Sequence, residues 1–298
     1  MNIGTLKYFK EIVETQSISK VAQNSHISQS ALSQIIQKLE AELGYKLLDR
    51  SNKGVHPTEM GKIVYKYSGT MLRIYQKMED ELYSRKQKLE NVRINGYSSF
   101  INYSLPCILY KIKKKFPGYK FEVHSKSNEE SFNDLSNEIT DLAFVSEEPC
   151  DDGLNYDFIG KEKIVLAACK NNNIPETITV EDLMKYEFVT LDDSYPINKF
   201  LRKKFRDVNL KMDDLKVVFE VDSIGAAKSS ITNNLGLSFL PYLSIKKELY
   251  EEEFKTIEIV DFSLDYDIYL ASKKDSTHVE SLNPIINYFV KSGTSEFC

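Results

Sequence analysis

The sequence lacks the segments that mark membrane and secreted proteins. No apolar run approaches the length of a membrane span, which needs about 20 consecutive apolar residues. The first 14 residues, MNIGTLKYFKEIVE, carry acidic side chains and a helical periodicity in place of the apolar core of a signal peptide. We therefore expect a cytoplasmic protein with no membrane partner.

Cysteine is scarce and scattered. The four cysteines form no CxxC pair and no cluster with histidine at metal-ligand spacing; they are Cys107, Cys150, Cys169 and Cys298. We expect each to be a small buried apolar residue or a free thiol. No metal site is predicted.

The common enzyme motifs are absent too. The chain has no GxSxG, HExxH, GxxxxGK[ST] or GxGxxG sequence. Its four histidines lie far apart and have no metal-ligand partner at helical spacing; they are His26, His56, His124 and His278. We expect no catalytic residues and no cofactor, and therefore no enzyme.

Charge is distributed unevenly along the 298 residues. Residues 1–90 hold 14 Lys and Arg against 10 Asp and Glu, a balance of +4, which leaves 25 against 34, or −9, for residues 91–298. A basic amino-terminal segment on an acidic chain points to a nucleic-acid partner at that end.

A chain of this length is also too long for a single hydrophobic core, so two or three compact units are expected.

Residues 18–50 predict a helix, a tight turn and a second helix with two unlike faces. One face of the second helix is an apolar stripe at i, i+3, i+4, i+7 spacing: Leu32, Ile35, Ile36, Leu39 and Leu43. The other face is polar: Gln29, Ser30, Ser33, Gln34, Gln37 and Lys38. Such amide, hydroxyl and cationic groups hydrogen-bond to base edges and phosphates in a major groove, and Ser28 is placed to cap the helix. An ordinary amphipathic helix with a solvated polar face is the alternative.

Two short strands with a polar turn are predicted after the second helix. They cover 46–50 and 55–57, with Gly54 at the tip of the turn. A hairpin beside a helix-turn-helix can lay Arg50 and Lys53 on the phosphate backbone or in the minor groove. A first helix over 2–14 completes a small winged domain.

With these features the chain resembles the LysR-type transcriptional regulators. The matching pattern runs through Leu6-Lys7-Tyr8-Phe9, Ser17-Ile18, Val21-Ala22, Ile27-Ser28-Gln29, Ala31-Leu32-Ser33, Leu39-Glu40, Leu43-Gly44, Arg50, Gly54, Thr58-Glu59 and Gly61. Ser30 stands where the family usually has proline. The resemblance implies a winged helix-turn-helix DNA-binding domain over 1–58. The candidate DNA-binding residues are Ser28, Gln29, Ser30, Ser33 and Gln34, with Lys38, Arg50 and Lys53 for the DNA backbone.

A long helix with a narrow apolar line is predicted next, over 59–90. Its apolar residues step by three and four: Met60, Val64, Tyr67, Met71, Ile74 and Met78, extended by Leu82 and Leu89. A line at this period has to meet another helix, so we expect a homodimer seam that sets the separation of two reading helices. Packing of this helix on the chain's own effector domain is the alternative. By resemblance, the helix links the DNA-binding and sensing domains.

Strand and helix patterns alternate from residue 91 to residue 298, which predicts parallel sheets covered on both faces. Short motifs match landmarks of the family's effector domain: Leu105-Pro106, Phe116-Pro117-Gly118, Asp141-Leu142-Ala143, Glu220-Val221-Asp222-Ser223 and LGLSFLP at 235–241. The resemblance implies a two-subdomain, periplasmic-binding-protein-like α/β effector domain, with subdomain I at about 91–161 and 266–298 and subdomain II at about 162–265. Asn234 stands where glycine is usual, and asparagine tolerates the left-handed conformation expected there.

Ligands of parallel α/β sheets bind at the carboxyl ends of strands, where helix amino termini offer N–H groups. The candidate effector-binding residues lie in such loops: Ser98, Ser99, Asn128, Ser194, Tyr195, Pro196, Asp222 and Ser223. By resemblance, Ser99, Asn128 and the loop at 194–196 line the cleft between the subdomains. Each loop also fits a plain helix cap.

Acidic residues crowd the same loops: Glu129, Glu130, Asp192, Asp193 and Asp222. The hypothesis is a small carboxylate-bearing metabolite with a cationic end, such as an amino acid. Its carboxylate would meet the helix termini, and its ammonium group would meet one of the acids.

The sequence thus predicts an α/β protein with an amino-terminal winged helix-turn-helix, acting as a transcription regulator. It would bind double-stranded DNA with paired half-sites as a dimer or a dimer of dimers, respond to a metabolite, and have RNA polymerase as a further partner. Two alternatives stay open. One is a metabolite-binding protein or cryptic enzyme whose amino-terminal head docks protein, and the other is a regulator with no small-molecule effector.

Overall fold

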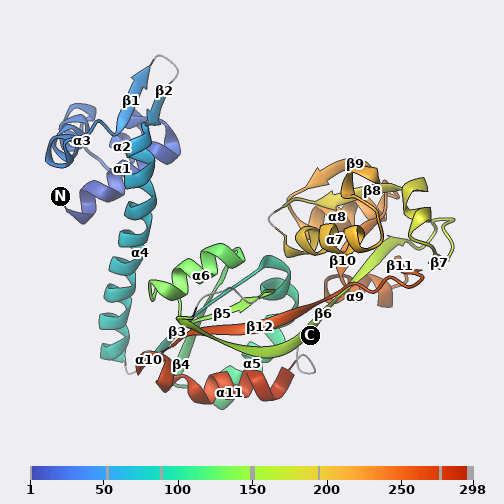
Figure 1. Cartoon of the computed structure of the whole chain (residues 1–298). Coiled ribbons are helices and arrows are strands. Elements are labelled where there is room, and N and C mark those ends of the chain that lie inside the picture. Colours follow the sequence, from blue (N-terminus) through green and yellow to red (C-terminus); the bar gives the residue numbers. More distant parts are fainter. Residues whose placement is uncertain are drawn as a thin grey trace. The chain divides into compact units, whose positions relative to one another are not determined.

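The computed structural model describes residues 2–51, 54–87, 90–147, 152–193, 195–274 and 277–293. The chain divides into two compact units, Met1–Lys88 and Leu89–Cys298 (Figure 1). Each unit has its own hydrophobic core. Within the described ranges no helix combines the length and the apolar character needed to cross a membrane.

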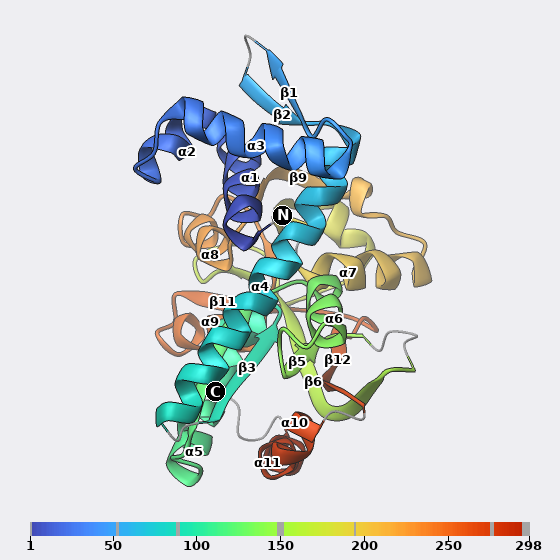
Figure 2. The same ribbon diagram turned by 90° about the vertical axis from the view of Figure 1, so that its left-hand side faces the viewer.

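The amino-terminal unit is a three-helix domain with a two-stranded wing. Its elements are α1 (Ile3–Thr15), α2 (Ile18–Asn24), α3 (Gln29–Leu43), β1 (Leu48–Ser51), β2 (Gly54–Pro57) and α4 (Glu59–Gln87). Phe9 of α1 and Leu32 and Ile36 of α3 are fully buried, so the stripe predicted for the second helix faces the core. Figure 2 shows α3 lying across α1 in this domain. Ile35 and Leu43, predicted in the same stripe, are only partly buried.

Local hydrogen bonds fix the ends of these helices and the wing. Ser28 caps α3 by accepting a hydrogen bond from the backbone N–H of Ala31 at 3.1 Å. Oε1 of Glu40 accepts hydrogen bonds from the N–H groups of Leu47 and Leu48 at 2.7 and 3.1 Å, which ties α3 to the start of β1. The wing is an antiparallel pair with Arg50 opposite Val55.

Gly61 allows α4 to begin against the wing. A Cβ atom at this position would lie 2.1 Å from the carbonyl oxygen of Leu47, closer than real atoms approach. The Thr58 hydroxyl accepts a hydrogen bond from the N–H of Gly61 at 3.0 Å and donates one to the carbonyl of Lys46 at 2.7 Å. The helix start and the wing are therefore held together.

The long helix α4 has 29 residues, about 44 Å at 1.5 Å per residue. Its exposed apolar side chains form a stripe with steps of three and four, which we call the α4 stripe: Met60, Ile63, Tyr67, Met71, Ile74, Met78 and Leu82. Ile63 replaces the predicted Val64, because Val64 packs against the core of the amino-terminal domain. Leu89 lies outside the described residues.

The carboxy-terminal unit contains strands and helices in alternation. In order they are β3 (Glu90–Gly96), the π-helix η1 (Phe100–Ser104), α5 (Leu105–Lys115), β4 (Tyr119–Ser125), α6 (Asn128–Ser136), β5 (Leu142–Val145), β6 (Leu154–Cys169), β7 (Thr177–Ile178), η2 (Glu181–Lys185), β8 (Glu187–Leu191), α7 (Pro196–Asp207), η3 (Met212–Asp214), β9 (Lys216–Val221), α8 (Ile224–Thr232), β10 (Ser238–Pro241), α9 (Tyr242–Tyr250), β11 (Phe254–Ile259), β12 (Asp265–Lys273), α10 (Thr277–Ser281) and α11 (Asn283–Ser292).

One mixed sheet runs through the whole unit in the order β4-β3-β5-β12-β6-β11-β7, with β10 also paired to β6 and a separate β8-β9 pair. Strand β6 begins beside β12 in subdomain I and continues into subdomain II, where it pairs with β10 and β11 (Figure 1). Subdomain I consists of β3–β5 with α5, α6 and α11, and subdomain II of β7–β11 with α7–α9. The two long strands β6 and β12 lie side by side where the subdomains join.

The prediction of parallel sheets is only partly right. Strand β3 pairs in parallel with β4 and β5, and β8 pairs in parallel with β9. Strand β6, however, is antiparallel to β12, β10 and β11.

Aromatic side chains fill the two parts of the core. In subdomain I the Phe144 ring lies 4.5 Å from that of Phe100 and 5.0 Å from that of Phe289. In subdomain II the Phe239 ring lies about 6 Å from Phe188 and Phe205, at 5.9 and 6.0 Å. These contacts hold β5, β8 and β10 under their covering helices.

Two local predictions have definite outcomes. Asn234 has φ 55°, so it adopts the left-handed conformation expected where the family usually has glycine. The expectation of free thiols is right for Cys169 and wrong for Cys107, which is disulfide-bonded.

Candidate functional site

The polar face of α3 lies at the surface of the amino-terminal domain. Gln29, Ser30, Gln34, Gln37 and Lys38 are exposed, as is the cap residue Ser28, whereas Ser33 is partly buried. The buried stripe is on the opposite face of the same helix. The helix therefore presents hydrogen-bonding groups outward along its first two and a half turns, as a major-groove reader requires.

Two of these side chains are held by neighbours. Oε1 of Gln29 accepts a hydrogen bond from the Ser19 hydroxyl of α2 at 3.0 Å, and the hydroxyls of Ser28 and Ser30 are 3.0 Å apart. The start of α3 is thus fixed against α2. Arg50 is described through its backbone in β1, and Lys53 lies outside the described residues.

A cleft of 380 Å³ opens between the two subdomains. Subdomain I lines it with the start of α6 and the loop after β5, subdomain II lines it with the start of α7, and Tyr266 lines it from the joining strand β12. The lining residues are Ser127, Asn128, Glu129, Ser146, Glu147, Asp193, Tyr195, Pro196, Lys199, Phe200, Lys203 and Tyr266.

Of the predicted effector-binding residues, Asn128, Tyr195 and Pro196 line this cleft together. Ser98 instead accepts a hydrogen bond from Asn102 at 3.1 Å, and Ser223 caps α8 after the exposed Asp222. Ser99 is buried behind Tyr266, and Ser194 lies outside the described residues. None of Ser98, Ser99, Asp222 and Ser223 is among the lining residues.

The predicted acids also separate into two groups. Glu129 and Asp193 line the cleft, whereas Glu130 forms a capping box with Ser127 at the start of α6. Partial burial raises the pKa of Glu130, but hydrogen bonds from Ser127 and Lys126 outweigh it and leave the pKa below its usual value. Glu130 is therefore committed to the helix cap.

An ion pair crosses the cleft. Nζ of Lys199 on α7 lies 2.5 Å from Oε2 of Glu147, and Nδ2 of Asn128 donates a hydrogen bond to the other carboxylate oxygen at 3.3 Å. Burial raises the pKa of Glu147, but Lys199 and Asn128 lower it by more. The pKa therefore lies below its usual value, and the carboxylate is ionised at neutral pH. Sequence reasoning missed Glu147, Lys199 and Lys203, since each resembles an ordinary surface charge in the sequence.

The wall from subdomain II is basic and aromatic. No side chain of the described residues caps the amino terminus of α7, and Lys199 and Lys203 lie on its cleft-facing side. The Phe200 ring lies 5.6 Å from that of Tyr266, with Tyr195 beside them in the lining. An anionic group fits the helix terminus and the lysines, while a cationic group fits the aromatic rings and the acids Glu129 and Asp193.

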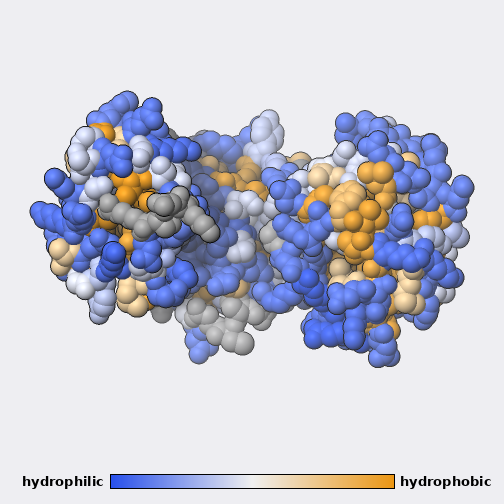
Figure 3. All heavy atoms as spheres, turned by 90° about the horizontal axis from the view of Figure 1, so that it is seen from above, coloured by the Kyte–Doolittle hydropathy of each residue, from blue (hydrophilic) through white to orange (hydrophobic). Residues whose placement is uncertain are grey.

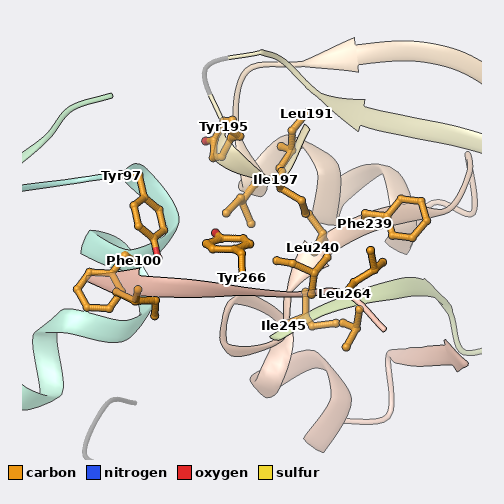
Figure 4. Close-up of a cluster of buried hydrophobic side chains, with 14 of the residues drawn as sticks. Tyr97, Phe100, Leu191, Tyr195, Ile197, Phe239, Leu240, Ile245, Leu264 and Tyr266 are labelled. Carbon is orange, nitrogen blue, oxygen red and sulfur yellow. The ribbon is translucent and has the colours of Figure 1, made fainter. Parts of the chain in front are cut away.

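Tyr266, one of the aromatic residues that line the cleft, contacts the buried side chain of Glu162. The Tyr266 hydroxyl donates a hydrogen bond to Oε2 of Glu162, and the Ser99 hydroxyl donates another at 3.3 Å. Burial raises the pKa of Glu162 to about 7, against the opposing effect of these hydroxyls. Figure 4 shows the Tyr266 ring between Tyr97 of subdomain I and Ile197 of subdomain II.

Residues 3–62 match the model of the bacterial regulatory helix-turn-helix proteins of the lysR family, and residues 85–293 match the LysR substrate binding domain. The chain belongs to the LysR family. Among LysR relatives it is 27% identical over 252 residues to the nitrogen assimilation regulatory protein nac of Escherichia coli, covering 81% of this chain and 78% of the relative. It is 25% identical to the transcriptional regulator CysL of Bacillus subtilis, covering 89% and 88%.

Solved structures agree on the fold. The crystal structure of CbnR, a LysR family transcriptional regulator, matches with a TM-score of 0.77 at 19% identity, over 98% of this chain and 99% of that one. As a LysR-type transcriptional regulator, the chain binds DNA through its helix-turn-helix domain, binds an effector in its substrate-binding domain and forms oligomers.

Proposed function

We propose that this regulator reads DNA through the first turns of α3. Gln29, Ser30, Ser33 and Gln34 contact base edges, and Ser28, Lys38, Arg50 and Lys53 contact the DNA backbone. The observation that carries this assignment is the polarity of α3, whose hydrogen-bonding side chains are at the surface while Leu32, Ile36 and Leu39 are buried. CbnR in complex with its target DNA has the same fold, with a TM-score of 0.75 at 20% identity.

The proposed assembly is a dimer through α4. The α4 stripe leaves seven large apolar side chains exposed on one helix, among them Tyr67 and Leu82, each 59% exposed. A second copy of the same helix would cover them and set the distance between two α3 helices on paired half-sites.

A second apolar patch supports a dimer of dimers. Val217, Val218 and Phe219 of the edge strand β9 are 42%, 51% and 39% exposed. Figure 3 shows hydrophobic side chains gathered over this part of subdomain II. An edge strand with a row of apolar side chains is suited to pairing with another copy.

The proposed division of the chain is a DNA-binding domain at 1–58, a dimerising linker helix at 59–90 and an effector domain at 91–298. Within the last, subdomain I spans about 91–161 and 266–298, and subdomain II spans about 162–265. Support comes from Thr58 and Gly61, which begin α4 against the wing, and from β6 and β12, which join the subdomains.

For the effector, the proposal is a small molecule with one anionic and one cationic group, such as an amino acid. The amino terminus of α7, which no described side chain caps, suits a carboxylate together with Lys199 and Lys203. Glu129, Asp193 and the aromatic rings suit an ammonium group. The open volume of 380 Å³ argues against a regulator whose cleft is filled by its own side chains.

We further propose that the protein acts in the cytoplasm and has no catalytic activity. In the described part of the chain no group of His, Cys, Asp and Glu could hold a metal ion.

Two measurements test the proposal. Genome-wide mapping of occupied sites would supply the operator, and binding to that fragment should weaken steeply as salt rises, since phosphate contacts release counterions. A head that only docks protein would show no such binding. Calorimetry with free amino acids and with simple dicarboxylates tests the effector class, and tighter binding of the dicarboxylates would overturn it.

A further inference from the structure

The two strands that join the subdomains carry an acid and a phenol at directly opposed positions. Glu162 on β6 is the cross-strand partner of Tyr266 on β12, and their side chains are hydrogen-bonded. Glu162 is 4% exposed and Tyr266 6% exposed. The pair thus lies in the interior, on the two strands that join the subdomains.

The hydrogen bonding around Glu162 is incomplete. Its Oε2 accepts hydrogen bonds from Tyr266 and Ser99. Its Oε1 is buried and has no hydrogen-bond partner among the described residues, and the same is true of the Tyr97 hydroxyl. An ionised carboxylate with one unpaired oxygen is destabilised in the interior, and a proton on that oxygen removes the charge. This balance accounts for a pKa of about 7, raised by burial.

Glu162 is the group in this cluster that changes charge near neutral pH. Facing it from the neighbouring elements are the phenols of Tyr97 and Tyr266, and burial raises the pKa of both well above 10. Ser99 does not titrate. The adjacent charged residues of the two strands point to the opposite face of the sheet, because side chains alternate along a strand; they are Lys161, Lys163, Asp265 and Asp267.

Tyr266 connects this acid to the cleft. Tyr266 lines the cleft together with Tyr195 and Phe200, while its hydroxyl donates a hydrogen bond to Glu162. The face of a phenol ring attracts cations. A phenol that donates to a carboxylate is polarised toward more negative charge on the ring, and a buried negative charge acts strongly through the low-dielectric interior.

We propose that Glu162 acts through Tyr266 as a positioning residue that makes the affinity of the effector cleft for a cationic group depend on proton binding. The ionised carboxylate holds the phenol and favours the cation, and the protonated acid weakens this preference. By linkage, a bound cation in turn favours the ionised form of Glu162. The inference rests on the proposed effector site and adds to it a dependence on pH.

The test uses the full chain and a probe that needs no knowledge of the effector. Tetramethylammonium and an uncharged molecule of similar size, neopentyl alcohol, are compared by saturation-transfer NMR at about pH 6 and about pH 8. We expect the wild-type protein to saturate tetramethylammonium at least about threefold more strongly at the higher pH. Neopentyl alcohol should give the same signal at both pH values.

Three variants locate the effect. Glu162→Gln keeps the size of the side chain but cannot ionise, so the pH dependence should disappear. Tyr266→Phe keeps the ring and removes the hydroxyl, so the signal at the higher pH should fall. Glu258→Gln removes an exposed glutamate from β11 of the same sheet and should behave as wild type.

Each outcome decides the inference. Unchanged pH dependence in Glu162→Gln, its loss in Glu258→Gln, or no saturation of tetramethylammonium at either pH would overturn it. If Glu162→Gln fails to fold, Tyr266→Phe alone decides. Calorimetry tests separately whether the effector is an amino acid. The binding of tetramethylammonium can depend on the ionisation of Glu162 even if no amino acid binds.

Discussion

Nζ of Lys199 lies 2.5 Å from Oε2 of Glu147, so an ion pair joins α7 of subdomain II to the loop after β5 of subdomain I. Both side chains line the cleft. Lys199 is 76% exposed, so the pair adds little to the free energy of unfolding. The proposed carboxylate of the effector would compete with Glu147 for the same ammonium group, so we expect the pair to matter for ligand binding.

Replacing Lys199 by Met should weaken binding of the amino acid or dicarboxylate that calorimetry identifies by about tenfold or more, because a charge-assisted hydrogen bond is lost. Glu147→Gln is the matched variant: it removes the competitor and should leave the affinity unchanged or improve it. Calorimetry measures both. Equal losses in the two variants would show that the ion pair matters for structure and not for the ligand.

Gln29→Ala should cost roughly 1 to 3 kcal/mol on the cognate operator and little on random DNA, since an amide that reads a base edge discriminates between sequences. Ser19→Ala is the control, because it removes the hydroxyl that donates to Oε1 of Gln29 and leaves Gln29 in place. Fluorescence anisotropy on both DNA fragments gives the comparison. Similar losses of affinity on the two DNA fragments would show that Gln29 positions the protein on DNA and does not read a base.

A charge in the middle of the α4 stripe should break the dimer. Ile74 is 45% exposed in the single chain, and Ile74→Glu would bury an unpaired carboxylate in the proposed seam. We expect sedimentation velocity to show the assembly losing half its mass or more. Gln76→Glu adds the same charge at an exposed position beside the stripe and should leave the mass unchanged. A dimer that survives in both variants would place the interface elsewhere.

Glu162 should make stability fall as pH rises toward neutrality. Its pKa is raised from the ordinary 4.5 to about 7, so the folded protein gains stability from the protonated acid below pH 4.5 and loses it as pH passes about 7. The difference corresponds to roughly 3 kcal/mol. Urea unfolding at about pH 5 and about pH 8 should therefore show that Glu162→Gln is stabilised relative to wild type at the higher pH. Parallel pH profiles would contradict this.

Gly61→Ala should destabilise the amino-terminal domain by roughly 2 to 4 kcal/mol, because the new methyl group would collide with the carbonyl oxygen of Leu47. Gly225→Ala in α8 is the control, since a methyl group there meets nothing within 4 Å. It should be neutral or slightly stabilising. Circular dichroism melting compares the two.

The helix-turn-helix could be predicted because its determinants are local. The spacing of Leu32, Ile36 and Leu39 fixes one face of α3, and Ser28 supplies the cap within three residues. The same holds for the α4 stripe, where only the choice between Ile63 and Val64 was wrong. That choice depends on the rotation of α4 against the core of the domain, which no local pattern specifies.

The cleft could be predicted only in outline. Asn128 and Tyr195 follow strand ends, which the sequence reveals, but Glu147 and Lys199 meet only after the two subdomains pack. Glu162 was missed because it stands between Lys161 and Lys163 in the sequence, a pattern typical of a solvated surface. Its burial follows from pairing with β12, more than 100 residues away. The antiparallel pairing of β6 has the same long-range origin.

Strand β6 has a consequence for the way the effector domain melts. Because a single strand is hydrogen-bonded to β12 at one end and to β10 and β11 at the other, neither subdomain can lose its strand without exposing the sheet of the other. The domain should therefore denature in one cooperative transition. Amide exchange of its two halves should slow to the same limiting rate.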